Sequence, residues 1–243
     1  MDNLLTMFIE NNFNNLQLEI KKICDLMNKD YRSITTIAVS KGRHFNAIKL
    51  LYELGHHNFG ENKVQEITHK LKDASNQKQL RNINWHFIGH LQTNKVAKLI
   101  PYIKTLHSLN SLKLLETIES YHGKIPTNRN IAMTNRLECF IQVNIAREEQ
   151  KKGISVNELN SFLIKCKKSN AVKIKGLMTI APLSNNAEDS RKIFQELKFL
   201  ANKYDLNELS MGMTNDYKIA LEEGATSLRI GRLIFERNGS VTL

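Results

Sequence analysis

Apolar segments of the strand type alternate along the chain with segments of helical period, and this alternation restricts the fold more than any other feature. The strand-like segments are nearly continuous apolar runs, as found in strands that are covered on both faces. The helical segments carry apolar stripes such as Phe45, Ile48 and Leu51, and Gly55 follows this stripe as a natural stop. The expected strands lie near residues 34–40, 57–60, 84–89, 103–108, 137–145, 173–180, 208–212 and 226–230.

Eight strands separated by helices predict a parallel sheet, because each crossover helix returns the chain to the same edge. Eight is also the number that closes a (β/α)₈ barrel of the TIM type. The pattern therefore predicts an α/β fold in which residues 1–243 form a single barrel domain, preceded by an extra helix over roughly residues 3–28. An open, doubly wound sheet is the alternative, although no GxGxxG or Walker sequence follows the first strand.

The composition indicates a cytoplasmic protein. Three cysteines lie far apart and form no CxxC pair, which argues against a disulfide framework and a structural zinc site. The N-terminus lacks the pattern of a signal peptide, and no apolar run is long enough for a membrane helix. The net charge is +11, but the lysines are spread over almost every expected helix without interleaved aromatic residues. We therefore expect neither nucleic acid nor a membrane as a partner.

Polar residues and glycines gather where the expected strands end, and the active sites of such barrels lie at that face. Lys41 follows the first strand, where a buried apolar run ends in a charged residue. Ser210 and Thr214 follow the seventh strand, and Gly231 and Arg232 follow the eighth. Glycines and hydroxyls in these last two loops are typical of a phosphate site. A phosphate site opposite a lysine predicts a phosphorylated aldehyde held as a Schiff base, for which pyridoxal 5'-phosphate is the obvious candidate.

The order and spacing of several short blocks resemble those of the pyridoxal phosphate homeostasis proteins, a family similar to the N-terminal barrel of alanine racemase. The resemblance spans about residues 30–236. It is carried by AVSK, FGEN, WHFIGHLQTNK, HSLNS, QVNIAREEQKKGI, GLMTIAP, LSMGMTNDYKIALEEGATSLRIG and IF.

The resemblance implies a role for individual residues. Lys41 corresponds to the lysine that forms the Schiff base, and Arg229 to an arginine that faces the pyridine nitrogen in related barrels. A permanently charged arginine would keep that nitrogen unprotonated and make the ring a poor electron sink. Further cofactor contacts are implied at Asn62, Ser210, Thr214 and Gly231.

Three positions depart from the family pattern. Gly42-Arg43-His44 stands where the family more often has a threonine followed by a proline, and Glu236 stands where a glycine is common. Arg232 replaces a small hydroxyl residue; either its guanidinium or only its backbone N–H then contacts the phosphate. His86 and His90 have a spacing seen in metal sites, but without a clear third ligand we expect no metal.

Two functions compete for this site. The first is a non-catalytic carrier that buffers pyridoxal phosphate, with apo-enzymes as candidate recipients; we expect it to be a monomer. The second is an amino-acid racemase, which needs acid–base groups on both faces of its substrate. In alanine racemase the second base is a tyrosine from another domain, and the sequence ends at Leu243, soon after the last strand. The sequence therefore favours the carrier.

Overall fold

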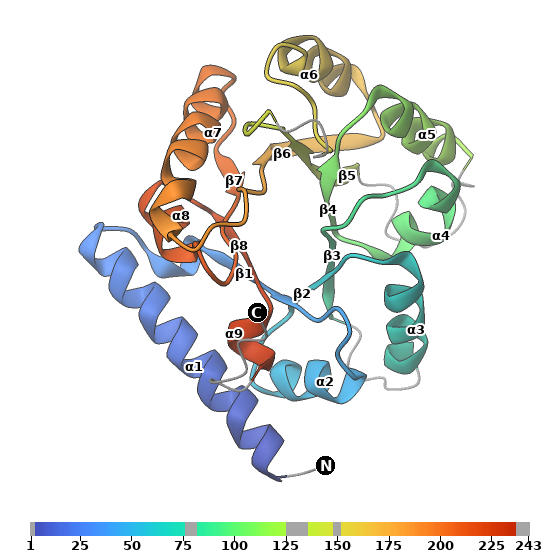
Figure 1. The fold of residues 1–243 in the computed structure, drawn as a ribbon. Helices are drawn as coiled ribbons and strands as arrows, with labels where there is room; N and C mark the ends of the chain where they lie inside the picture. Colours follow the sequence, from blue (N-terminus) through green and yellow to red (C-terminus); the bar gives the residue numbers. More distant parts are fainter. Residues whose placement is uncertain (1–2, 76–81, 125–135, 148–151, 237–243) are drawn as a thin grey trace.

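The computed structural model describes residues 3–75, 82–124, 136–147 and 152–236, and in it the eight expected strands form one closed parallel barrel (Figure 1). Each strand pairs with the next, and the last pairs with the first, so the barrel prediction is confirmed and the open sheet is wrong. The strands are β1 (Thr35–Val39), β2 (Asn58–Glu61), β3 (Asn84–Phe87), β4 (Thr105–Leu109), β5 (Leu137–Gln142), β6 (Val172–Met178), β7 (Glu208–Ser210) and β8 (Ser227–Ile230).

The helices surround the barrel (Figure 1). The apolar stripes of the longer helices are buried. In the first of them Phe45, Ile48 and Leu51 are buried, as their spacing predicts. The helices are α2 (Phe45–Glu53), α3 (Val64–Ser75), α4 (Val96–Leu99), α5 (Leu112–His122), α6 (Leu159–Lys168), α7 (Arg191–Lys203), α8 (Tyr217–Glu222) and α9 (Arg232–Phe235). Short 3₁₀ turns lie at Tyr31–Ser33, Thr93–Lys95, Ile100–Tyr102 and Ala187–Ser190.

The expected N-terminal helix is present as α1 (Asn3–Leu26), which crosses α2, α8 and α9 on the outside of the barrel (Figure 1). Its buried side is a stripe of residues three or four apart: Ile9, Phe13, Leu16, Ile20 and Cys24. The amide of Asn12 donates to the backbone oxygens of Ile234 and Glu236, at 3.3 and 3.2 Å. Helix α1 therefore anchors the segment that follows β8.

The sequence predicts that Thr214 or Asn215 caps the helix after the seventh strand, α8, but the structure starts this helix later. The helix begins at Tyr217, and Asp216 precedes it. The carboxylate of Asp216 accepts from the backbone N–H of Met213 at 2.6 Å, and this contact closes the turn after β7. Thr214 and Asn215 are thereby left at the end of the barrel, where they face a cavity.

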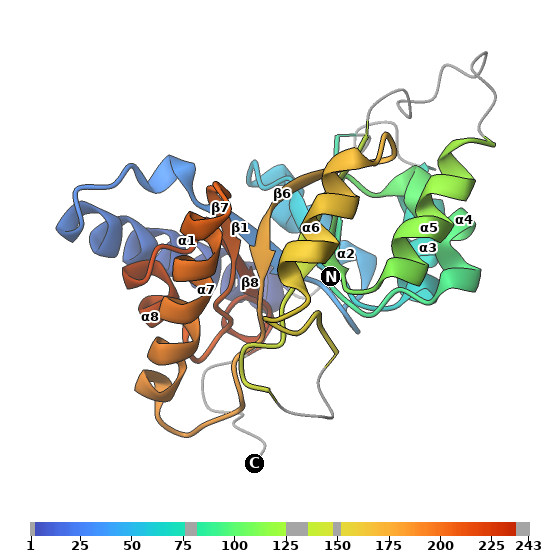
Figure 2. The same ribbon diagram turned by 90° about the horizontal axis from the view of Figure 1, so that it is seen from above.

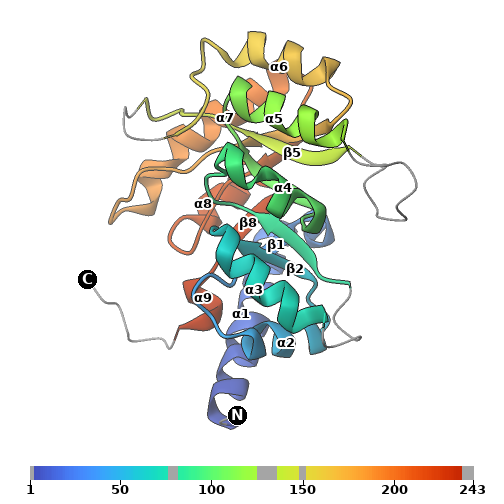
Figure 3. The ribbon, with the colours of Figure 1, turned by 90° about the vertical axis from the view of Figure 1, so that its right-hand side faces the viewer.

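Segments that follow the strands project from one end of the barrel. In Figures 2 and 3 the segment linking β6 to α7 projects from the end at which the strands finish. That end is the one expected to hold the functional residues of a barrel of this kind. Among the described helices, none combines the length and apolarity needed to cross a membrane.

Candidate functional site

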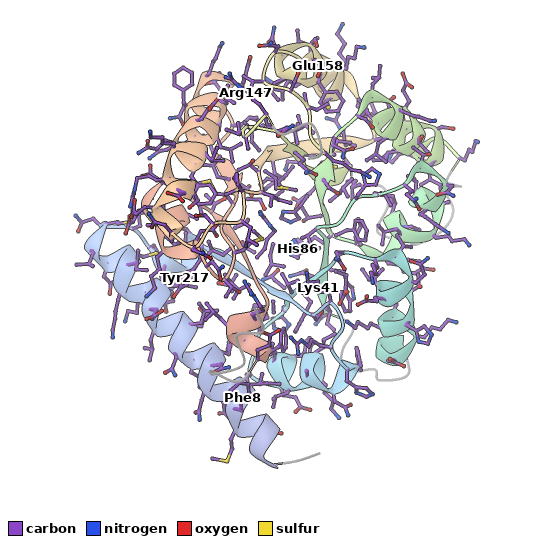
Figure 4. The ribbon with its side chains drawn as sticks, viewed as in Figure 1. Phe8, Lys41, His86, Arg147, Glu158 and Tyr217 are labelled. Atoms are coloured by element: carbon purple, nitrogen blue, oxygen red, sulfur yellow. The ribbon has the colours of Figure 1, made fainter. Side chains whose placement is uncertain are left out.

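A cavity of about 800 Å³ opens at the C-terminal ends of the strands. It is lined by residues that follow β1, β2, β3, β5, β6, β7 and β8, so the barrel brings together segments from the whole chain. Figure 4 shows Lys41 near the middle of the barrel in the view along its axis. Six of the seven residues singled out from the sequence line this cavity: Lys41, Asn62, Thr214, Arg229, Gly231 and Arg232.

Ser210 does not line the cavity, although its sequence position predicts a direct cofactor contact. Its side chain is fully buried at the end of β7. The hydroxyl oxygen accepts from Nη1 of Arg229 at 2.8 Å and lies 2.8 Å from Nδ1 of His107. Ser210 thus contacts Arg229 on the side away from the cavity.

Arg229 is the most deeply buried of the cavity-lining cations. Its Nη1 donates to Ser210 Oγ, and its Nη2 donates to the backbone oxygen of Thr179 at 2.9 Å. Burial lowers the pKa of Arg229 to about 10, while the nearby charge of Asp216 acts in the opposite direction. At neutral pH the guanidinium therefore remains charged and is held by two protein acceptors.

The backbone directly before Lys41 is fixed by a buried ion pair. Nζ of Lys70, on α3, donates to the backbone oxygen of Ser40 at 2.6 Å and to Oε1 of Glu61 at 2.5 Å. The hydroxyl of Ser40 donates to the same carboxylate oxygen at 2.6 Å. Burial raises the pKa of Glu61, and the contacts with Lys70 and Ser40 oppose that rise. The side chain of Lys41 itself is exposed at the mouth of the cavity, so this amine is not buried.

Asn62 presents a polar atom that has no protein partner. Its Oδ1 is buried without a hydrogen-bond partner in the described structure, and its side chain lines the cavity. The backbone of Asn62 lies so close to Gly89 that a Cβ there would stand 2.1 Å from the Asn62 oxygen. A buried polar group normally finds a partner, so Asn62 marks a position where a ligand would complete the site.

The charges around the cavity favour an anionic ligand. Lys41, Lys152, Arg229 and Arg232 line it, whereas Asp216 is the one carboxylate among the described lining residues. One oxygen of that carboxylate is already occupied by the N–H of Met213. Thr214 adds a hydroxyl, and α9 starts directly after Gly231, so that the first amides of this helix have no acceptor within it.

Two of the departures from the family pattern contact each other. Nη2 of Arg43 lies 2.6 Å from Oε1 of Glu236, and both side chains are one-third exposed. The guanidinium of Arg43 also lies over the ring of Phe235, 5.9 Å from its centroid. The third departure, Arg232, is exposed and donates to Oδ1 of Asn215 at 3.0 Å. Arg43 and Glu236 thereby tie the loop after β1 to the turn after α9.

The two histidines considered as a metal pair have separate surroundings. His86 is buried inside the barrel and contacts His107 at 3.0 Å. His90 lines the cavity, where burial and then the charge of Lys152 lower its pKa. Within the described ranges, no cluster of three or more His, Cys, Asp or Glu side chains is arranged to hold a metal ion.

Several cavity-lining residues were missed in the sequence. Ser184 and Asn186 come from the segment between β6 and α7, and only the path of that segment over the barrel end brings them to the site. Lys152 is placed by the amide of Gln142, which donates to its backbone oxygen at 2.5 Å. Residues 148–151 of the QVNIAREEQKKGI block lie outside the described residues.

Comparison with known proteins agrees with the motifs. A model of the family described as alanine racemase, N-terminal domain, matches residues 13–238. A pyridoxal phosphate homeostasis protein of Aquifex aeolicus is 36% identical over 225 residues, which cover 89% of this chain and 92% of the relative. One from Haemophilus influenzae is 33% identical over 236 residues, 94% of this chain and 95% of the relative. The structure of PipY from Synechococcus elongatus PCC7942, with PLP bound, superposes with a TM-score of 0.74 at 30% identity, covering 89% of this chain and 99% of PipY.

Proposed function

The chain belongs to the pyridoxal phosphate homeostasis proteins and matches the family model of the alanine racemase N-terminal domain, and from this we propose that it binds pyridoxal 5'-phosphate and acts in its intracellular homeostasis. The observation that carries the proposal is the shared cavity of Lys41 and the two loops after β7 and β8. A single ligand in this cavity would place its aldehyde near Lys41 and its phosphate near Thr214 and Gly231. This arrangement is the one that the strand ends predict.

The described residues fit the cofactor. The lining cations and the hydroxyl of Thr214 suit a phosphate, and the first amides of α9 would add backbone donors. The unpartnered Oδ1 of Asn62 supplies a polar contact on the side of β2. Arg229, held by Ser210 and Thr179, would face the pyridine nitrogen and keep it unprotonated.

Bound in this cavity, the cofactor supplies an aldehyde that can be held covalently. Nζ of Lys41, once unprotonated, would hold the cofactor at its aldehyde carbon, with one water released. Because Lys41 is exposed at the cavity mouth, another amine can approach the same carbon. Reversible attachment at an accessible site suits a carrier that buffers the cofactor or passes it to apo-enzymes, and we propose that it does so as a monomer.

Sodium borohydride reduction of the loaded protein should attach one cofactor per chain, at Lys41. Reduction converts the Schiff base to a stable secondary amine, so peptide mass analysis reports both stoichiometry and position. Lys41→Ala should abolish the attachment and the colour of the loaded protein. Lys152→Ala is the matched control, because Lys152 lines the same cavity and should leave attachment intact. Attachment at another lysine, with Lys41 unmodified, would show that the assigned site is wrong.

No racemisation of alanine or serine is expected above the rate of free pyridoxal phosphate. Racemisation needs acid–base groups on both faces of the substrate, and no tyrosine is among the described residues that line the cavity. Arg229 also disfavours the protonated ring that would accept charge from the α-carbon. Chiral analysis after long incubation in deuterated water measures the result, with Lys41→Ala as the control. Lysine-dependent deuterium incorporation with inversion would support the racemase instead.

A further inference from the structure

A continuous chain of hydrogen bonds crosses the interior of the barrel from the cavity to the opposite end. Arg229 Nη1 lies 2.8 Å from Ser210 Oγ, which in turn lies 2.8 Å from His107 Nδ1. His107 Nε2 lies 3.0 Å from His86 Nδ1, and His86 Nε2 lies 3.2 Å from Asn58 Oδ1. These residues come from β8, β7, β4, β3 and β2 in that order, and Figure 4 shows His86 near the middle of the barrel.

At the cavity end, a guanidinium can only donate, so Ser210 Oγ accepts from Nη1 of Arg229. The hydroxyl has a second lone pair and one proton, so it can meet Nδ1 of His107 as acceptor or as donor. It donates when the neutral imidazole of His107 carries its proton on Nε2. His107 then donates to Nδ1 of His86, and His86 carries its own proton on Nε2.

The other end of the chain determines the direction of these hydrogen bonds. His86 Nε2 faces Oδ1 of Asn58, and this oxygen also receives the amide of Asn84 at 3.2 Å. An amide oxygen only accepts, so Nε2 of His86 must carry the proton. With its proton on Nε2, neutral His86 accepts at Nδ1 from Nε2–H of His107, and Nδ1 of neutral His107 is left as the acceptor for Ser210.

The surroundings keep both imidazoles neutral. His107 is fully buried and stacks on Phe140, with 4.6 Å between ring centroids. Burial lowers the pKa of His86 to about 3, with smaller contributions from Lys104 and His56. Burial also lowers the pKa of His107 well below its usual value, and the proximity of His86 and the charge of Arg229 act in the same direction. A second proton on His107 would turn its acceptor for Ser210 into a donor.

We propose that His107 and His86 are positioning residues, which act through Ser210 to hold the guanidinium of Arg229 in one orientation in the cavity. With its proton bound to His107, Ser210 presents a lone pair to Nη1 of Arg229, while Thr179 holds Nη2. Without that acceptor, the hydroxyl of Ser210 can rotate and release Nη1. The effect on bound cofactor rests on the proposed function, whereas the orientation of Arg229 can be measured in the protein without cofactor.

The tautomers can be tested on the full chain without cofactor. Protein labelled with ¹⁵N-histidine should show His86 and His107 as neutral Nε2–H tautomers at pH 7, with no change on lowering the pH to about 5. An Nδ1–H tautomer or an imidazolium at either position at pH 7 would overturn the assigned direction. This measurement needs no substitution, so it does not depend on a variant that folds.

Two substitutions at His107 test the effect on Arg229. His107→Phe removes the acceptor but keeps a ring against Phe140, whereas His107→Asn retains an amide oxygen where Nδ1 stands. The guanidinium ¹⁵N–¹H signals of Arg229 should be separately resolved in the parent, averaged by rotation in His107→Phe and resolved again in His107→Asn. His57→Phe, a half-buried histidine outside the chain of hydrogen bonds, is the control. Unchanged Arg229 signals in His107→Phe would overturn the proposal.

The cofactor measurement separates this inference from the proposed function. In protein loaded with pyridoxal phosphate, His107→Phe should shift the pH titration of the absorbance band by about one unit, the size of one hydrogen bond to a charged group. His107→Asn should restore it. If the parent takes up no cofactor but Arg229 is released in His107→Phe, the proposed function fails and the positioning role stands. Altered Arg229 signals with an unshifted titration would confine the role to the protein and overturn its effect on the cofactor.

Discussion

Lowering the pH from 6.5 to 4.5 should reduce the free energy of unfolding by about 5 kcal/mol, because two buried histidines remain neutral in the folded chain. Burial lowers the pKa of His56 to about 4 and that of His86 to about 3, both from 6.5. Below pH 6.5 these two histidines therefore bind protons in the unfolded chain but not in the folded chain. Each histidine then removes about 1.4 kcal/mol of stability per pH unit, and a domain of this kind has only about 5–15 kcal/mol in total.

Other titratable groups change how steeply the free energy of unfolding falls with pH. His107 acts in the same direction, because burial also lowers its pKa. Glu61 and Asp216 act in the opposite direction: burial raises their pKa values, so the folded chain binds their protons first as the pH falls. Their effect begins above the ordinary pKa of a carboxyl group, where the folded chain starts to bind these protons, and is complete near that ordinary value, so the loss of stability should start at about pH 6.5 and flatten towards pH 4.

Urea unfolding at a series of pH values measures this dependence. His56→Gln should reduce the change in the free energy of unfolding between pH 6.5 and 4.5 by about 1.4 kcal/mol per pH unit. The variant lacks one histidine that binds a proton only in the unfolded chain. His69→Gln, at an exposed position on α3, should leave the slope unchanged. A free energy of unfolding that stays constant over this range would contradict the neutral, buried state of these imidazoles.

Replacing Lys70 by methionine should lower the free energy of unfolding by about 3–5 kcal/mol, since one partner of a buried ion pair is lost. The side chain of Lys70 is 8% exposed and that of Glu61 is fully buried. Removal of the ammonium leaves a buried carboxylate with Ser40 as its remaining donor, and Oε2 of Glu61 already has no partner in the described structure. The backbone oxygen of Ser40, next to Lys41, loses its contact with Lys70 as well.

Two further variants test the electrostatic origin of this loss. In Glu61→Gln/Lys70→Met the buried charge is gone, so the double variant should be more stable than Lys70→Met alone. Lys63→Met is the matched control: Lys63 is 67% exposed and lies 3.7 Å from Glu66, and its loss should cost about 0.5 kcal/mol or less. If Lys70→Met unfolds within about 1 kcal/mol of the parent protein, the pair does not hold this part of the barrel.

Much of the architecture could be predicted because it depends on local patterns. The apolar stripe of α2 and the strand runs report burial and period, and eight such units close a parallel barrel. The residues at the strand ends were also predictable, since the carboxyl ends of parallel strands meet at one face. For that reason Lys41 and Gly231, at opposite ends of the sequence, were expected at one site, and both line the cavity.

Side-chain partners were not predictable in the same way. Ser210 has the position of a ligand contact in the sequence, but it turns behind Arg229 and contacts His107, 103 residues away. Arg43 and Glu236 are 193 residues apart and form an ion pair only because β8 closes against β1. The cap of α8 was misassigned because Asp216 precedes the helix, and its carboxylate closes the turn after β7 by accepting from the N–H of Met213.

By itself, the sequence determined the class of fold, the order of the elements and the face on which the lysine, the glycines and the hydroxyls gather. These properties follow from period, burial and turn chemistry, which act over a few residues. Only the tertiary structure decided that Lys70 neutralises Glu61 and that two histidines direct the proton of Ser210. Those contacts join different strands and helices across a closed barrel, and their distances depend on barrel register and side-chain rotamers, which no local pattern contains.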